Sequence, residues 1–170
     1  MEELAGVLGL SLDELMEVDS VDLEERGMVE LPLPVTALPA CQELFLNGNA
    51  LQFLPPEIGN LCSLRELNIT HNELVELPDA LGNLAQLEGL LCSQNRLAAL
   101  PETIGNCSAL RGINANENGL SVFPDSLCAC SQMEGLYADS NQLIELPEAI
   151  GALQGLEEVH RHPTPDRLLR

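Results

Sequence analysis

The chain has 170 residues, enough for one domain with a buried core, and a formal net charge of −20 from 27 acidic and seven basic residues. This surface repels phosphate backbones and anionic lipid heads, so the composition disfavours nucleic acid and membrane surfaces as partners and leaves a protein partner with a basic surface. The plainer reading is that acidity only keeps the domain soluble. No stretch is long and apolar enough to span a bilayer as a helix.

The first segment, residues 1–17, is expected to form a helix that caps the rest of the chain. Ser11 and Glu14 have the spacing of a capping box, in which each side chain satisfies a free backbone N–H at the start of a helix. The segment begins with Glu2 and Glu3, where a secretion signal has positive charge. We therefore interpret it as part of the fold and not as a targeting peptide.

From residue 18 onward the sequence repeats itself every 23 residues. Five units are regular, at 41–63, 64–86, 87–109, 110–132 and 133–155. A degenerate unit at 18–40 precedes them, so that 18–155 holds six repeats, and residues 156–170 are read as an incomplete seventh repeat and tail. Repetition at a period of this length predicts a solenoid, whose units bury their apolar faces only against their neighbours.

One polar residue recurs at the 23-residue step inside each leucine-rich unit. In the unit 87–109, Leu90 and Cys92 alternate with outward residues as in a half-buried strand, and the chain then turns and returns from Pro101. Buried turns require partners for their backbone groups, and an asparagine amide supplies both donors and an acceptor. We therefore predict a structural ladder formed by Asn49, Asn72, Asn95, Asn118 and Asn141. Arg26 takes the corresponding place in the degenerate unit.

The unit reads L-x-x-L-x-L-x-x-N-x-L-x-x-L-P-x-x-I-G-x-L, which resembles the leucine-rich repeat family over residues 18–159. The resemblance implies an α/β solenoid: a curved right-handed coil with parallel strands on its concave face and short helical or irregular return segments on its convex face. The endings "LPPEIGNL" at 54–61 and "LPETIGNC" at 100–107 look like the intracellular Ras-group-related, Ras-suppressor and Scribble-like repeats. Those proteins are cytoplasmic scaffolds that bind signalling partners through the concave face.

The six cysteines are placed as free thiols and not as a disulfide framework. Four occupy inward positions of the repeat, where a thiol acts as a small apolar side chain: Cys41, Cys92, Cys107 and Cys130. Cys62 and Cys128 lie on the return side and are expected to be partly exposed. A reducing, cytoplasmic location follows from this pattern. Cys128 and Cys130 have no second pair nearby in sequence, so no metal site and no cofactor are predicted.

Outward residues of successive strands are expected to form columns on the concave face, in a band roughly 30 Å long that could contribute about 800 Å² to an interface. The predicted partner-binding residues are Phe45, Asn68, Leu91, Asn114 and Tyr137 in one column, Ser93, Asn116 and Asp139 in the next, and Glu117 beside them. A column of glycines, Gly89, Gly112 and Gly135, lowers the surface next to them. The alternative is that these side chains only cover a sheet.

The function that follows is a non-enzymatic scaffold that binds a protein partner through the concave face, in intracellular signalling. The chain contains none of the phosphate-binding, calcium-binding or nucleophile motifs that would indicate catalysis. Three alternatives stay open: the recognition segment of a larger enzyme such as a kinase or GTPase, a structural or vestigial repeat protein without a partner, and a hydrolase that uses His71.

Overall fold

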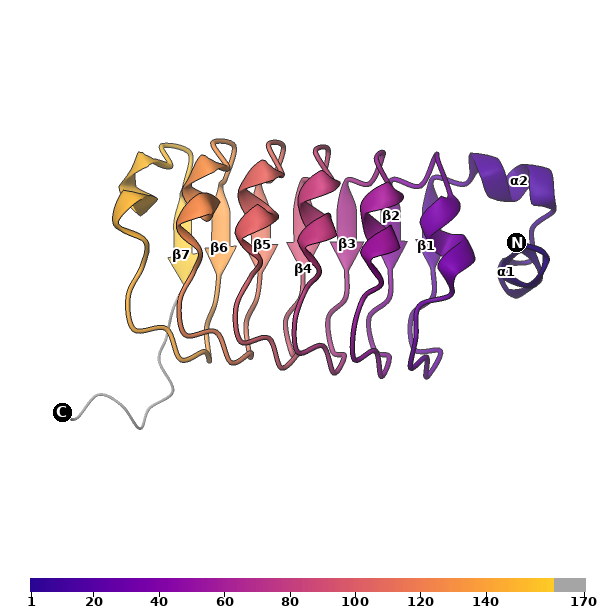
Figure 1. Ribbon diagram of the computed structural model, residues 1–170, viewed down its shortest axis with the longest axis horizontal. Coiled ribbons are helices and arrows are strands. Elements are labelled where there is room, and N and C mark those ends of the chain that lie inside the picture. Colours follow the sequence, from indigo (N-terminus) through magenta and orange to yellow (C-terminus); the bar gives the residue numbers. More distant parts are fainter. Residues whose placement is uncertain (161–170) are drawn as a thin grey trace.

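The computed structural model describes residues 1–160 and shows a solenoid of stacked coils (Figure 1). Seven three-residue strands form one parallel sheet in sequential order. The strands are β1 (Ser20–Asp22), β2 (Glu43–Phe45), β3 (Glu66–Asn68), β4 (Gly89–Leu91), β5 (Gly112–Asn114), β6 (Gly135–Tyr137) and β7 (Glu158–His160). The predicted fold class is confirmed.

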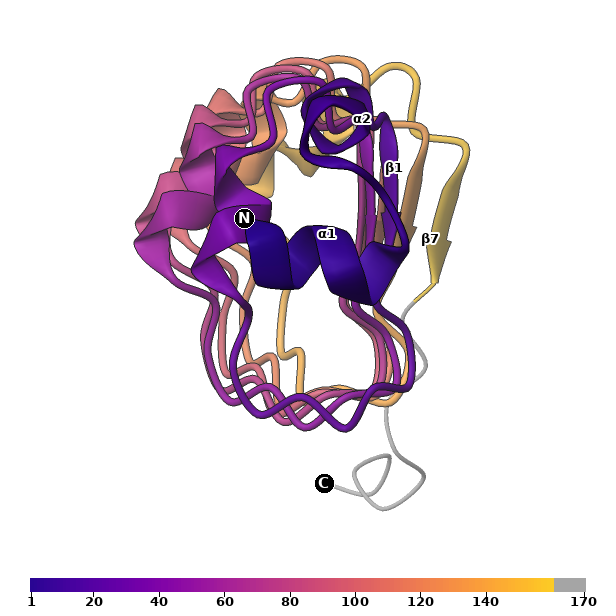
Figure 2. The same ribbon diagram turned by 90° about the vertical axis from the view of Figure 1, so that its right-hand side faces the viewer.

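The return segments lie on the side opposite the sheet, as the end-on view in Figure 2 shows. Each contains one turn of 3₁₀-helix: η1 (Leu33–Ala37), η2 (Pro56–Asn60), η3 (Asp79–Asn83), η4 (Glu102–Asn106), η5 (Asp125–Ala129) and η6 (Glu148–Ala152). A proline precedes each of these turns, and its fixed φ suits the start of a helix. The predicted return segments are therefore short 3₁₀-helices.

Strand register follows the sequence period without a shift. Leu44 pairs with Leu67, and Leu67 with Leu90, so each leucine at the centre of a strand lies beside the same position of the next unit. A shift of one residue would turn the inward leucines to the solvent, and burial of one face therefore fixes the register.

Two helices, and not one, form the N-terminal segment: α1 (Glu2–Leu8) and α2 (Leu12–Glu17). Gly9, with φ of 70°, ends α1 in the left-handed conformation. The capping box is present at α2, where the Ser11 N–H donates to Glu14 Oε2 at 2.8 Å and the Glu14 N–H donates to Ser11 Oγ at 3.3 Å. The hydrogen bond from the Ser11 backbone lowers the pKa of Glu14. In Figure 2, α1 crosses the first end of the solenoid.

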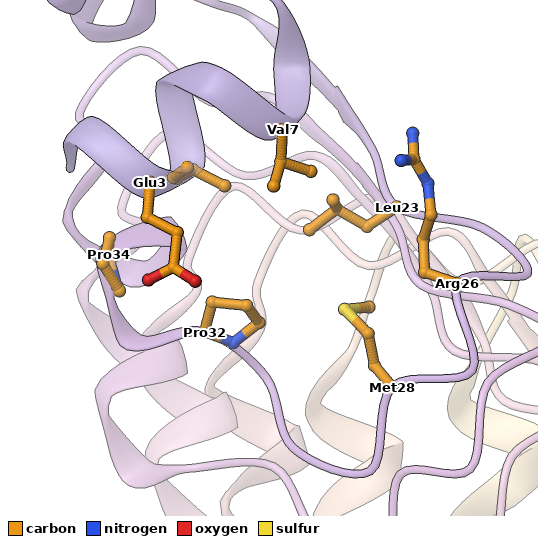
Figure 3. A pocket seen from close by; sticks show the side chains of 8 residues that line it. Glu3, Val7, Leu23, Arg26, Met28, Pro32 and Pro34 are labelled. Atoms are coloured by element: carbon orange, nitrogen blue, oxygen red, sulfur yellow. The ribbon is translucent and has the colours of Figure 1, made fainter.

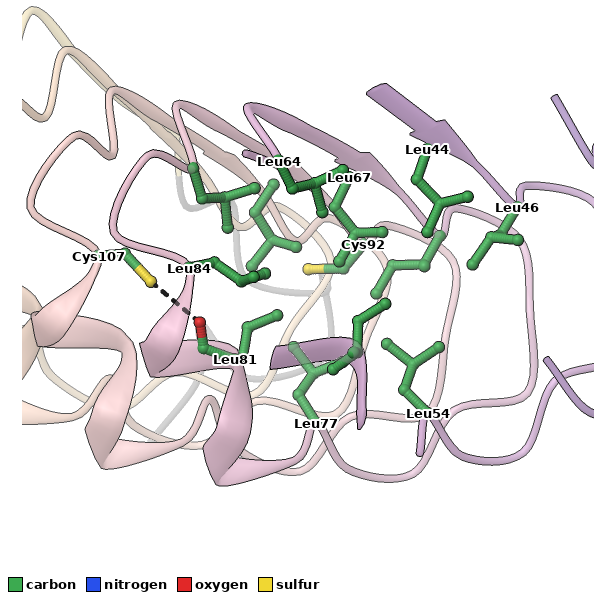
Figure 4. Close-up of a cluster of buried hydrophobic side chains, with 14 of the residues drawn as sticks. Leu44, Leu46, Leu54, Leu64, Leu67, Leu77, Leu81, Leu84, Cys92 and Cys107 are labelled. Carbon is green, nitrogen blue, oxygen red and sulfur yellow. Dashed lines mark hydrogen bonds between the residues drawn. The ribbon is translucent and has the colours of Figure 1, made fainter. Parts of the chain in front are cut away.

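The core is a continuous column of leucines between the sheet and the 3₁₀-helices (Figure 4). Four cysteines are buried in it, which confirms the inward positions predicted for them, whereas Cys62 is exposed and Cys128 half-buried. Cys107 Sγ lies 3.4 Å from the carbonyl oxygen of Leu81, and Cys130 Sγ is placed in the same way against Ile104. All six thiols are free.

Glycines allow the 3₁₀-helices to pack closely. A Cβ on Gly82 would lie 2.5 Å from the Thr103 carbonyl oxygen of the next unit, and one on Gly105 would lie 2.3 Å from that of Ser126. Cys128 occupies the equivalent place in η5. No residue of η6 is buried, unlike those of η2 to η5.

The predicted incomplete seventh unit contributes a strand. Backbone pairing of β7 with β6 extends the sheet to residue 160. The remainder of the predicted tail, residues 161–170, lies outside the described part of the chain.

Candidate partner-binding surface

The outer side of the sheet, called the sheet face below, carries the predicted partner-binding residues. Parallel register places the third residues of β2 to β6 side by side, and all five are half-buried: Phe45, Asn68, Leu91, Asn114 and Tyr137. Adjacent parallel strands lie about 4.8 Å apart, so this row crosses the face along the solenoid axis. The structure thus brings two aromatic rings and a leucine into one line.

The next row of the sheet face is polar and is cross-linked between units. Thr70 Oγ1 and Ser93 Oγ lie 3.3 Å apart, and the Asp139 N–H donates to Asn116 Oδ1 at 2.7 Å. Ser93 is buried, and the other three are half-buried. These hydrogen bonds fix the side chains before any partner arrives, which reduces the entropy lost on binding.

A third row marks the turn at the end of each strand. Its members precede the ladder positions and have positive φ: Glu25 (49°), Gly48 (69°), His71 (55°), Gln94 (54°), Glu117 (54°) and Ser140 (58°). Residues other than glycine rarely adopt this left-handed conformation. Gln94 Nε2 lies 3.2 Å from Glu117 Oε1. Glu117, one of the predicted partner-binding residues, is therefore exposed on a fixed turn.

Glycines at the first residue of three strands make a furrow beside the row of Leu91 and Tyr137. Nothing lies within 4 Å of a Cβ built on Gly112, and only Glu66 Cγ, at 3.8 Å, approaches one on Gly89. The third glycine, Gly135, lies against the ring of Tyr137, with 2.9 Å between a built Cβ and Tyr137 Cε2.

Ion pairs that were not predicted from the sequence border this furrow. Arg65 Nη1 lies 2.8 Å from Glu88 Oε1, and Arg111 pairs with Glu134 in the same way two units later. The hydrogen bonds to Glu134 raise the pKa of Arg111. The signal in the sequence was the alternation of arginine and glutamate at the 23-residue step.

Two hollows of about 370 and 380 Å³ open where these ion pairs meet the glycines. The first is lined by Gln42, Glu43, Arg65, Glu66, Glu88 and Gly89, and the second by Arg111, Gly112, Glu134, Gly135, Tyr137 and Glu157. Carboxylates outnumber arginines in both, so the furrow presents negative charge at its two ends.

The ladder asparagines face inward and pair backbone groups of the turns. Asn72 Oδ1 accepts the Leu51 N–H at 3.0 Å, and Asn72 Nδ2 donates to the carbonyl oxygens of Leu46 at 3.0 Å and Ile69 at 3.1 Å. The same pattern recurs at Asn49, Asn95, Asn118 and Asn141. Their amides connect consecutive units, which leaves the turns rigid under the sheet face.

A more apolar cavity of about 390 Å³ lies between α1 and the first unit (Figure 3). Val7, Leu23 and Met28 form its walls, and Glu3 and Arg26 lie at its rim. It occurs where Arg26 replaces the inward asparagine and the end of the solenoid is only partly covered by α1. That replacement is the one feature of the sequence that points to the cavity.

Within residues 1–160 no group of three or more His, Cys, Asp and Glu side chains could hold a metal ion. In the same range, no helix has the length and apolar character needed to cross a membrane. The candidate site is therefore the sheet face, an ordered surface of half-exposed side chains.

Comparison with known proteins supports the resemblance found in the sequence. Residues 39–97 match the family model of the leucine rich repeat. The solenoid agrees with this match, and the resemblance to the leucine-rich repeat family is confirmed. No curated protein sequence matches it.

Solved structures share the fold at low identity. The LRR protein LIC12759 of Leptospira interrogans is 26% identical with a TM-score of 0.74, over 86% of this chain and 44% of that one. The plant peptide hormone receptor RGFR1, in complex with RGF2, is 28% identical with a TM-score of 0.67, over 75% of this chain and 21% of that one.

A third structure is the LRR ectodomain of the Arabidopsis thaliana membrane receptor kinase GASSHO1/SCHENGEN3, in complex with CASPARIAN STRIP INTEGRITY FACTOR 2. It is 26% identical with a TM-score of 0.59, over 75% of this chain and 19% of that one. The chain thus spans less than half the length of each of these proteins. Leucine-rich repeats are commonly protein-interaction modules, and two of these structures contain a bound partner.

Proposed function

We propose that this chain is a non-enzymatic scaffold of the cytoplasm that binds a protein partner through its sheet face, in intracellular signalling. The observation that carries the proposal is the row of Phe45, Leu91 and Tyr137, which are half-exposed. Leu91 and Tyr137 lie beside a furrow whose floor is backbone. Aromatic and aliphatic side chains at the centre of a contact surface supply most of the binding energy in protein complexes.

The charge of the site indicates the kind of partner. Glu43 and Glu66 lie at one end of the furrow and Glu157 at the other, while the two arginines between them are already paired with glutamates. A partner with basic residues at the edge of an apolar contact would complement this arrangement.

The free thiols support a reducing compartment. Four buried cysteines contribute apolar packing, and an exposed free thiol such as Cys62 persists best where oxidants are scarce. His71, the candidate base of a hydrolase, is exposed at the turn after β3. Its backbone N–H donates to the Ser93 carbonyl oxygen at 2.9 Å. Its position is explained by the turn alone.

The test is affinity capture with mass spectrometry, followed by a binding titration with the purified partner. The double variant Leu91→Glu, Tyr137→Ala should lose the partner, with affinity lower by at least about tenfold. Circular dichroism and the melting temperature should stay close to wild type because both side chains are partly exposed. Leu33→Glu, at an exposed apolar position of η1, is the matched control and should bind normally. Retention of the partner by the double variant would show that another surface binds it.

A further inference from the structure

A second surface lies at the edge of the solenoid where each coil turns after its strand, along the lower side in Figure 1. In each unit the third and fourth residues after the ladder position point outward. At least one of these two residues is apolar in all six units. Five large members have exposed fractions of 62% (Val29), 49% (Phe53), 53% (Val75), 45% (Val122) and 76% (Ile144). Ala98 and Ala99, both exposed, continue the series between Val75 and Val122. We call these residues the edge stripe.

The edge stripe is unusual for this chain. Among residues 18–157, Leu33 is the only other large apolar residue that is exposed. Scattered apolar residues on a surface are ordinary, but here each of six consecutive units contributes an exposed apolar residue at one or the other of the same two positions. The core needs none of these side chains, because the apolar residues on either side of each pair, such as Leu51 and Leu54, already point inward.

Acidic residues run beside the edge stripe. The first turns of five consecutive 3₁₀-helices each hold one, a few residues further along the chain than the stripe: Glu57, Asp79, Glu102, Asp125 and Glu148. Three members of the edge stripe, Val29, Val75 and Ile144, are each followed directly by a glutamate. These are Glu30, Glu76 and Glu145. An apolar line with carboxylates along it favours an apolar ligand surface flanked by positive charge.

The spacing selects a helix over an extended chain. Units follow one another at about the strand spacing of 4.8 Å, so the edge stripe spans roughly 24 Å from Val29 to Ile144. An α-helix lying along the solenoid axis advances about 5.4 Å per turn and presents an apolar side chain to each unit, over roughly 16 residues. An extended chain repeats the same face only every 6.8 Å or so, which falls out of step after two units.

We propose that the edge stripe binds an amphipathic helix of a partner protein, with an apolar face towards the stripe and basic residues at its flanks. This surface is separate from the sheet face, and the two can be occupied independently.

The probe is a synthetic helical peptide of about 18 residues made of Leu, Ala and Lys, with leucine on one face, lysine at the flanks and a single tryptophan on the apolar face. The chain contains no tryptophan, so the emission of the peptide reports binding alone. We expect a blue shift on binding to wild type. The variant Val75→Ser, Ile144→Ser should weaken the affinity at least about tenfold.

The matched controls separate this proposal from its rivals. Leu33→Ser and Leu91→Glu should each change the affinity less than about twofold, and a scrambled peptide of the same composition should bind far more weakly. Equal binding of the scrambled peptide would overturn the proposal, as would equal binding by the double variant. Loss of binding in Leu91→Glu would place the helix on the sheet face instead. Sedimentation that shows a wild-type dimer and a monomeric double variant would identify a second copy of the chain as the occupant, against the proposal.

Discussion

The aromatic ring of Tyr137 lies over Gly135, the residue two positions before it on β6. A Cβ at Gly135 would be 2.9 Å from Tyr137 Cε2 and 3.3 Å from the hydroxyl oxygen, which is closer than ordinary van der Waals contact. Glycine at the first position of the strand therefore allows the ring to lie across the furrow. The aromatic residue and the glycine act as one unit of the candidate binding surface.

Gly135→Ala should move the ring of Tyr137 away from the furrow and weaken partner binding, with little effect on stability, because the ring can rotate towards solvent. Tyr137 is the only tyrosine and the chain has no tryptophan, so near-ultraviolet circular dichroism and the ring proton shifts report on it directly. Gly112→Ala is the matched control, since a Cβ there meets nothing within 4 Å. Identical tyrosine signals in the two variants would contradict the described packing.

The sequence predicts the repeat architecture well because one period determines both the inward pattern and the register. Once Leu44 and Leu67 both point inward, only one alignment of their strands buries both. The rows of the sheet face then follow, because residues at the same distance in sequence from these leucines lie side by side in successive units. Pairwise charges such as Arg65–Glu88 follow as well, but only if polar positions are compared between units as carefully as leucines.

The ends of the solenoid depend on contacts that no period describes. The Gly9 turn divides the N-terminal segment into two helices, which a capping box at Ser11 alone does not reveal. The cavity beside Arg26 arises from how α1 crosses the first unit. Steric fit between these elements decides that outcome.

Asn72→Ala should destabilise the chain by several kcal/mol, because the Leu51 N–H and the carbonyls of Leu46 and Ile69 lose a partner in a buried turn, at about 1–3 kcal/mol for each unsatisfied group. Urea denaturation measures the loss, and hydrogen exchange should be faster at the Leu51 amide. Gln52→Ala, at an exposed position of the preceding turn, should leave both measurements unchanged. Slow exchange at Leu51 in the asparagine variant would show that water or another group replaces the amide.

Gly105→Ala should lower the melting temperature, because its Cβ would lie 2.3 Å from the Ser126 carbonyl oxygen and force η4 and η5 apart. Overpacking of this kind typically costs about 1–3 kcal/mol. Gly151→Ala places the same change in η6, where no atom of residues 1–160 lies within 4 Å, and should leave the melting temperature unchanged or raise it slightly through reduced chain entropy. Equal melting temperatures for the two variants would mean that the 3₁₀-helices separate without cost.

Stability should fall at alkaline pH because of the buried thiols. Burial raises the pKa of Cys92 from 9.0 to about 12, and the pKa values of Cys41, Cys107 and Cys130 to about 11. Below pH 9 these thiols are protonated in both states, so their contribution to stability is fully present. Between pH 9 and 11 the unfolded chain releases protons that the folded chain retains, and unfolding becomes more favourable by up to about 1.4 kcal/mol per pH unit for each thiol.

Cys92→Ala should reduce this alkaline loss while costing little at pH 7.5, because Ala115 and Ala138 occupy the same position of later units and are likewise buried. Urea midpoints measured at pH 7.5, 9 and 10.5 give the slope for each protein. Cys62→Ala, which removes an exposed thiol outside the core, is the matched control. If Cys92→Ala were to keep the wild-type slope, the Cys92 thiol would have to ionise inside the folded core, which the surrounding leucines should prevent.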